Sequence, residues 1–274
     1  MTSQRISTVF QNCRQQQRAA LGVFISAGDP DRQTSEAILH GLPEAGVDIV
    51  ELGMPFSDPM ADGPVIQAGS LRALKAGMTL KSVLEMARGF RAAHPDVPLI
   101  LMGYYNPIYS YGTDAFIADA VAAGVDGLIM VDLPPEEDAE MCGPAQQAGL
   151  DFIRLVTPTT DAARLPVVLK HASGFIYYVS ITGITGTRSA SGASIADAMQ
   201  RLHQASDLPV VVGFGIRTPQ QVAEAARHAD GVVVGSAVVS TIAEGLDEEA
   251  RPDAACKDRV LAYVRQLASG TARQ

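Results

Sequence analysis

The sequence predicts a single closed barrel of eight parallel strands and surrounding helices, a (β/α)8 or TIM barrel, with an extra N-terminal helix. Its 274 residues are close to the roughly 250 that such a barrel uses. Short apolar runs rich in β-branched residues alternate eight times with segments of helical periodicity. Because neither a linker nor a shift in composition interrupts this alternation, we expect one domain over residues 1–274.

Composition and charge narrow the class of protein. Hydrophobic residues make up 47% and charged residues 19%, which excludes a disordered or low-complexity chain. The net charge of -9 and the absence of basic runs argue against nucleic acid as a partner. No apolar run approaches the roughly 18 residues that span a membrane, and the three cysteines lie far apart. We therefore expect a soluble, cytoplasmic protein that binds neither a membrane nor nucleic acid.

Residues 1–20 are predicted to form a helix that caps the barrel floor. Ile6, Val9, Phe10 and Cys13 fall at i, i+3, i+4 and i+7, on one face of a short helix. The same segment contains arginine, serine and threonine but no acidic residue, which is also the composition of a mitochondrial transit peptide. The helical pattern and the short distance to the first strand favour the capping helix.

The predicted strands are nearly continuous in apolar residues, as strands buried on both faces are. They are expected at Leu21–Ser26, Asp48–Leu52, Leu99–Gly103, Gly127–Val131, Asp151–Val156, Gly174–Val179, Pro209–Val212 and Gly231–Val234. Amphipathic helices are expected between them, among others at Ser35–Glu44, Leu80–Ala93, Thr113–Ala123, Glu136–Ala148 and Thr218–Arg227. An open, doubly wound sheet is the alternative, but its edge strands would need polar residues that these runs lack.

Glycines gather after the last three predicted strands. They lie at Gly183 and Gly186, at Gly213 and Gly215, and at Gly235 beside Ser236. In such a barrel the active site is built from the loops at the C-terminal ends of the strands, and glycine lets backbone N–H groups approach a phosphate. A tight turn explains any one of these glycines. Three consecutive glycine-rich loops favour a phosphate site instead.

Acidic residues follow the second predicted strand. Glu51 ends that strand, where partial desolvation would raise its pKa toward a value useful for proton transfer, although a structural salt bridge would explain it equally well. Asp62 lies in a loop rich in proline and glycine, where it could hold a substrate N–H as an ionised group. For Asp62, and more strongly for Asp58, the local sequence by itself favours a turn-forming role.

The positions of histidine and lysine argue against two other chemistries. All five histidines and all four lysines fall in or beside the predicted helices rather than at the C-terminal ends of the strands. A metal-dependent aldolase and a Schiff-base mechanism are therefore disfavoured, and we expect neither a metal nor a cofactor in this chain. Carboxylate acid–base chemistry on a phosphorylated small molecule remains.

The stretch Glu51–Gln67 resembles the signature of the tryptophan synthase alpha subunit family. The resemblance continues in order and spacing through Phe24–Pro30, Met102–Asn106, Asp132–Pro134, Tyr177–Gly186, Gly213–Ile216 and Gly235–Ser236. It implies a lyase that cleaves indole-3-glycerol phosphate by a retro-aldol reaction to indole and glyceraldehyde 3-phosphate, in the biosynthesis of tryptophan. It also implies a flexible loop over residues 180–193 and a partner, a beta subunit that carries pyridoxal phosphate in an α2β2 complex.

The resemblance assigns roles to individual residues. Glu51 would act as general acid and then base, Asp62 would hold the indole N–H, and Tyr177 would lie beside Glu51. The phosphate-binding positions implied are Gly186, Gly215, Gly235 and Ser236, and those of the apolar indole pocket are Phe24, Met102 and Ile129. Two other functions stay open: a different phosphosugar barrel, such as an isomerase, and a chain that only binds a phosphorylated ligand or activates a partner.

The segment 53–78 is expected to serve both the active site and the partner interface, with Pro55 and Asp58 at the interface. Its first part is predicted to expose Pro55, Phe56, Pro59 and Met60, and a stiff apolar loop of this kind suits an interface. The alternative is that Phe56 and Met60 fold back onto the rim of the barrel.

Overall fold

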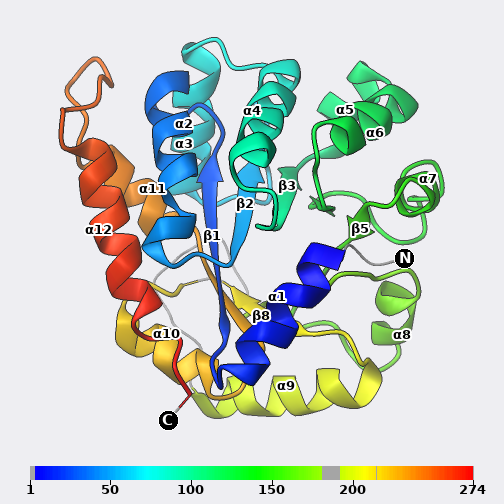
Figure 1. Cartoon of the computed structure of the whole chain (residues 1–274). Helices are drawn as coiled ribbons and strands as arrows, with labels where there is room; N and C mark the ends of the chain where they lie inside the picture. Colours follow the sequence, from blue (N-terminus) through cyan, green and yellow to red (C-terminus); the bar gives the residue numbers. More distant parts are fainter. Residues whose placement is uncertain (1–3, 181–191, 214, 274) are drawn as a thin grey trace.

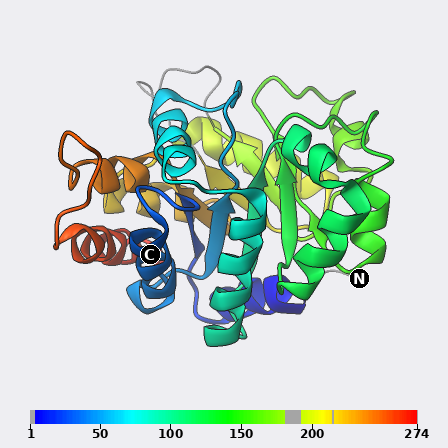
Figure 2. The same ribbon diagram turned by 90° about the horizontal axis from the view of Figure 1, so that it is seen from above.

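The computed structural model describes residues 4–180, 192–213 and 215–273, which form parallel strands enclosed by helices (Figures 1 and 2). The strands are β1 (Ala20–Ser26), β2 (Ile49–Gly53), β3 (Leu99–Gly103), β4 (Gly127–Met130), β5 (Asp151–Phe152), β6 (Arg154–Val156), β7 (Ile176–Val179), β8 (Val210–Gly213) and β9 (Gly231–Val234). They pair in the order β5-β4-β3-β2-β1-β9-β8-β7-β6. The predicted barrel is confirmed.

The fifth predicted strand, Asp151–Val156, is divided in two at Ile153. Its first half, β5, pairs with β4, and its second half, β6, pairs with β7. The N–H of Ile153 still donates to the carbonyl oxygen of Leu128, at 2.9 Å. The barrel is therefore closed at this point by the continuous chain from β5 to β6, because the first strand pairs with β4 and the second with β7.

Most predicted helices are found within a few residues of their expected ends. The helices are α1 (Gln4–Gln15), α2 (Arg32–Gly41), the 3-10 turn η1 (Pro43–Ala45), α3 (Pro64–Lys75), α4 (Leu80–Ala93), α5 (Tyr105–Tyr111), α6 (Thr113–Ala122), α7 (Cys142–Gln147), α8 (Leu165–Leu169), α9 (Gly192–Ala205), α10 (Pro219–Ala226), α11 (Ser236–Ala243) and α12 (Cys256–Ala268). Side chains of Asp31, Thr79 and Thr218 cap the N-termini of α2, α4 and α10. Within the described part of the chain, no helix has the length and apolar character needed to cross a membrane.

The predicted helix Glu136–Ala148 was wrong in its first half, since α7 begins only at Cys142. The preceding residues form turns, in which the N–H groups of Met141 and Cys142 both donate to the carbonyl oxygen of Asp138. The Asp138 side chain is buried in an ion pair with Arg154 of β6. A long-range ion pair thus holds a segment whose local pattern is helical.

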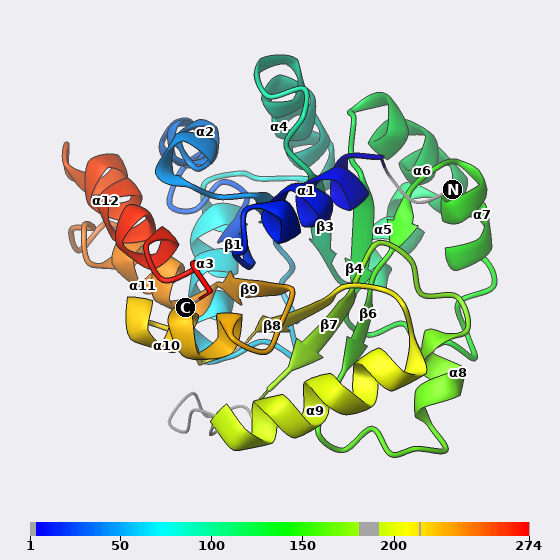
Figure 3. The ribbon, with the colours of Figure 1, turned by 60° about the horizontal axis from the view of Figure 1, so that its bottom comes forward.

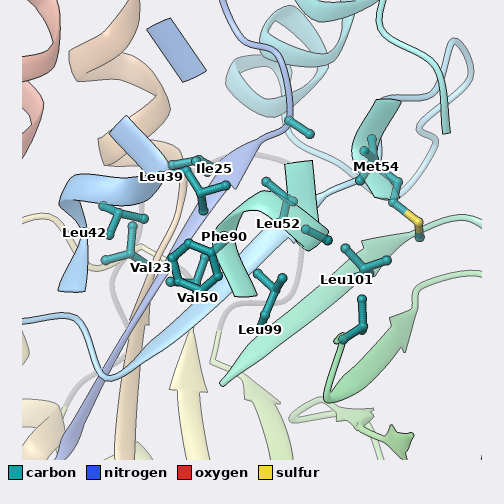
Figure 4. Packing of buried hydrophobic residues seen from close by; sticks show 14 of the residues in the cluster. Val23, Ile25, Leu39, Leu42, Val50, Leu52, Met54, Phe90, Leu99 and Leu101 are labelled. Carbon is teal, nitrogen blue, oxygen red and sulfur yellow. The ribbon is translucent and has the colours of Figure 1, made fainter. Parts of the chain in front are cut away.

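Helix α1 lies across the N-terminal end of the barrel (Figure 3), as the capping-helix prediction required. Its buried face, Ile6, Phe10 and Cys13, packs on the inward-facing side chains of the strands. The ring of Phe10 meets that of Phe175 edge to face, with 5.9 Å between centroids. A second core lies outside the barrel, between the strands and helices such as α2 and α4 (Figure 4).

Three aspartates, Asp48, Asp126 and Asp230, tie neighbouring strands together at the barrel floor, and we call them the floor aspartates. Each lies just before its own strand and accepts the backbone N–H of a residue at the start of the preceding strand in the barrel, at 2.8–3.0 Å. Each also meets a basic side chain: Arg18, Arg5 with Arg91, and His203, respectively. The floor aspartates thus accept backbone N–H groups at the N-terminal ends of the strands. They lie far from the C-terminal face, where the active site of such a barrel is built.

Candidate active site

Glu51 lies inside the barrel because it alternates along β2 with Val50 and Leu52, whose side chains belong to the outer core. It is completely buried, and neither carboxylate oxygen has a hydrogen-bond partner among the described residues. Burial alone raises the pKa of Glu51 to about 8. The carboxyl group is therefore mostly protonated at neutral pH. A structural salt bridge, the alternative suggested by the sequence, is not found among the described residues.

Tyr177 of β7 lies near Glu51. Burial and, second, the charge of Glu51 raise the pKa of the Tyr177 phenol well above its ordinary value, so the hydroxyl remains protonated. The hydroxyl lies over Gly213 at the end of β8, where a Cβ atom would collide with it. Ser180 joins the same two strand ends, because its hydroxyl donates to the carbonyl oxygen of Gly213 at 2.9 Å. Tyr177 is thus held in a slot that only glycine leaves open.

Asp62 lies in the loop between β2 and α3 and is half-buried. Burial raises the pKa of its carboxyl group to about 6, and a hydrogen bond from the Tyr104 hydroxyl acts in the opposite direction. The same hydroxyl accepts the backbone N–H of Ala61, at 3.0 Å. The contact with Tyr104, rather than a turn with the following glycine, therefore orients Asp62, which is mostly ionised at neutral pH.

Sequence analysis did not single out Tyr104 as a site residue. It follows β3 directly, is buried, and its ring lies 5.5 Å from that of Phe56 between centroids. Burial and then the charge of Asp62 raise the pKa of its phenol, so it donates a hydrogen bond throughout the neutral range. The available signal was its position: a hydroxyl-bearing residue next to the C-terminal end of a barrel strand.

The residues expected to form the indole pocket share the inner face of the barrel with Glu51. Phe24 is the register partner of Glu51 in the pairing of β1 with β2, and its ring lies over Gly53. Met102 of β3 is the register partner of Ile129 in β4, and both pack in the interior cluster. Ile129 is fully buried, whereas Met102 is partly exposed. The strands therefore surround Glu51 with apolar side chains.

Two parts of the expected phosphate site are described. Gly215, with φ 78°, adopts the left-handed conformation that favours glycine. Gly235 is the N-cap of α11, Ser236 is its first residue, and no side chain caps this helix. The first amides of α11 thus begin at the C-terminal end of β9 and suit an anion. Gly186, Gly183 and nearly all of the loop 180–193 lie outside the described residues.

The segment 53–78 differs from its predicted form in two ways. It is not one loop, because α3 occupies residues 64–75. Its expected exposure was wrong for Pro59, which is buried, while Phe56 folds back against Tyr104. Met60 is 77% exposed, Asp58 is exposed and Pro55 is half-buried. The apolar surface offered by this loop is thus narrower than predicted and centres on Met60.

Among the described residues, no group of three or more histidine, cysteine, aspartate or glutamate side chains could hold a metal ion. His40 and His203 lie within helices, and His94 is the C-cap of α4. Beside the carboxyl groups of Glu51 and Asp62 lie the hydroxyl groups of Tyr177 and Tyr104, respectively. Their arrangement among apolar side chains, near the N-terminus of α11, suits proton transfer.

Comparison with known proteins agrees with this geometry. The family model described as tryptophan synthase alpha chain matches residues 10–271. A crystal structure of tryptophan synthase subunit alpha from Legionella pneumophila is similar, with 39% sequence identity, a TM-score of 0.88 and 97% of each chain covered. A structure of tryptophan synthase from Mycobacterium tuberculosis matches with 36% identity and a TM-score of 0.89 over 100% of both chains. The chain therefore belongs to the tryptophan synthase alpha chain family.

Proposed function

We propose that this chain is the alpha subunit of a tryptophan synthase and cleaves indole-3-glycerol phosphate to indole and glyceraldehyde 3-phosphate. One observation carries the proposal: a fully buried carboxyl group without a hydrogen-bond partner, Glu51, lies inside the barrel with its pKa raised to about 8. A carboxylic acid that keeps its proton at neutral pH can act as a general acid toward a bound substrate. Family membership supports a lyase of tryptophan synthesis.

In the proposed reaction, Glu51 donates its proton to C3 of the indole ring, which gives the cationic indolenine. As the bond between C3 and the glycerol chain breaks, its electron pair returns to the ring and restores neutral indole. The adjacent glycerol hydroxyl becomes the aldehyde and loses its proton, which the Glu51 carboxylate accepts. Glu51 ends in its starting state, so the reaction consumes no external acid, base or oxidant.

Asp62 takes the opposite electrostatic role. Because its pKa of about 6 leaves it mostly ionised at neutral pH, it accepts the indole N–H and stabilises the positive charge of the indolenine. Two carboxyl groups thus carry different protonation states because the barrel interior desolvates Glu51 completely and Asp62 only in part. Tyr104 keeps the Asp62 carboxylate oriented, and Tyr177 borders Glu51.

The remaining groups bind the two ends of the substrate. Phe24, Met102 and Ile129 form apolar walls suited to the indole ring. Backbone N–H groups at Gly215 and at Gly235–Ser236 bind the phosphate, and the family resemblance adds Gly186 to these positions. Binding both ends places the scissile carbon–carbon bond beside Glu51.

We further propose that the chain works with a beta subunit in an α2β2 complex that holds pyridoxal phosphate in the beta subunit and receives the indole. The structures of Mycobacterium tuberculosis tryptophan synthase, one of them an aminoacrylate-bound form, support such a partner. The loop with Pro55, Asp58 and the exposed Met60 lies beside Asp62 and is the proposed contact. Asp58→Ala should lower the activation by the beta subunit more than it lowers the basal rate, which a titration with the partner measures.

The decisive test is indole release from indole-3-glycerol phosphate by the purified chain, with and without a beta subunit. Glu51→Gln should lower kcat by roughly 10²- to 10⁴-fold, because the amide keeps the shape but transfers no proton. Glu224→Gln, an exposed change on α10, is the matched control and should have the wild-type rate. Cleavage by Glu51→Gln at the rate of this control would refute the proposed mechanism.

A further inference from the structure

Gln67 of α3 connects the helix to the loop that carries Asp62. Its side-chain amide donates to the carbonyl oxygen of Asp62 at 2.9 Å and lies 3.5 Å from the carbonyl oxygen of Pro59. The N–H of Asp62 donates to the same Pro59 oxygen, at 3.0 Å. One side chain therefore bonds to the backbone on both sides of the turn that ends at Asp62.

Helix α3 is itself fixed rigidly to the barrel. Arg72 forms two hydrogen bonds with the carboxylate of Asp29, at 2.7 and 2.9 Å, and Asp29 is completely buried. Gly69, one turn before Arg72, approaches so closely that a Cβ atom there would lie 2.8 Å from an Asp29 oxygen. A buried, two-point ion pair and a close backbone approach leave α3 little freedom to move. Gln67 thus ties the loop to a helix that is anchored to the barrel.

Two side chains hold Asp62, in addition to the hydrogen bond from its own N–H to Pro59. Tyr104 contacts the carboxylate and accepts the N–H of Ala61, while Gln67 binds the carbonyl oxygen of Asp62 itself. A carboxylate that must face an indole N–H needs its main chain as well as its side chain held in place. A displacement of about 1 Å at a reacting group lowers rates by as much as 10²-fold.

We propose that Gln67 is a positioning residue for Asp62, which sets the backbone of the catalytic loop and acts on the reaction only through that carboxylate. This inference rests on the proposed function. It explains why a half-buried glutamine follows the loop at this position of α3, where an apolar residue would cover the same area. A purely structural glutamine would instead cap the turn without any specific link to Asp62.

The test is a double-mutant cycle between Gln67→Leu and Asp62→Asn, measured by indole release at high enzyme concentration. Gln67→Leu keeps the size and removes both donors, and we expect kcat to fall roughly 10- to 100-fold with a smaller change in KM. In the Asp62→Asn background the same change should have almost no further effect. Gln220→Leu on the exposed side of α10 is the matched control, and its kcat and Tm should equal those of the wild type.

The results of this cycle separate a positioning role from a purely structural one. If the losses from Gln67→Leu and Asp62→Asn multiply, or if Gln67→Leu changes only Tm, the positioning role is overturned. If Gln67→Leu does not fold, Gln67→Met, of similar length, takes its place in the cycle. Wild-type chain that releases no indole, alone or with a beta subunit, would overturn the proposed function itself, whereas an active wild type with an unaffected Gln67→Leu would overturn the positioning role alone.

Discussion

Replacing Glu51 by glutamine should make the protein progressively more stable, relative to the wild type, as the pH rises. In the folded chain burial holds the pKa of Glu51 at about 8, against a reference value of 4.5. Between these values the folded state keeps a proton that the unfolded state has lost, so the free energy of unfolding decreases with pH. The decrease is about 1.4 kcal/mol per pH unit, which amounts to about 3 kcal/mol by pH 7 and about 4 kcal/mol by pH 8, where the folded group is half ionised.

The neutral amide of Glu51→Gln removes this dependence. The measurement is urea unfolding of wild type and variant between pH 5 and 9, followed by circular dichroism. The cost of burying an amide without a partner is the same at every pH, so it shifts the difference between the two proteins but not its slope. The difference should widen up to about pH 8 and then level off. For Glu224→Gln, which changes an exposed side chain, it should stay flat.

A constant difference between Glu51→Gln and wild type from pH 5 to 8 would refute the reasoning. It would mean that the carboxyl group has an ordinary pKa in the folded chain, because water or an ionic partner reaches it. The role of Glu51 as a protonated acid would then lose its physical basis, whatever the kinetics of the variant.

Three further outcomes are expected. Asp62→Asn should lower kcat about 10²- to 10³-fold relative to the exposed control Asp207→Asn, because the ionised carboxylate is needed. For the same reason the kcat of the wild type should fall as the pH decreases through about 6. A kcat independent of pH from 5 to 7 would contradict this role of Asp62. Gly235→Val should weaken the binding of glycerol phosphate, measured by calorimetry, because a branched side chain fills the space before α11. Gly89→Val on α4 is the control and should not change the affinity, because a Cβ at Gly89 meets only open space. Equal affinities of the two variants would exclude the phosphate site. Asp126→Ala should lower the free energy of unfolding by about 3–5 kcal/mol while kcat at low temperature stays unchanged, because it removes the carboxylate that pairs with Arg91 and Arg5 and leaves the N–H of Leu99 without its acceptor. A loss below about 1 kcal/mol would show that Asp126 is dispensable for stability.

Local sequence determined most elements of the barrel. Strands β3 and β9 and helix α4 lie where the apolar periodicity placed them, because each pattern is strong and is bounded by polar or turn-forming residues. The apolar face of α1 likewise predicted that this helix caps the barrel floor. The eightfold alternation and the rule that active sites lie at the C-terminal ends of strands also located Glu51 and the last glycine-rich loops.

The tertiary structure decided what depends on partners distant in sequence. The break at Ile153 and the late start of α7 follow from pairing with β7 and from the buried ion pair between Asp138 and Arg154, which no local pattern encodes. The protonation states of the acidic side chains also depend on partners distant in sequence. Glu51 and Asp62 are ordinary acids in the sequence, and only complete burial of one and the Tyr104 contact of the other separate their pKa values. Periodicity reports which face of an element is apolar, whereas desolvation and hydrogen-bond geometry arise only when the loops and strands meet in space.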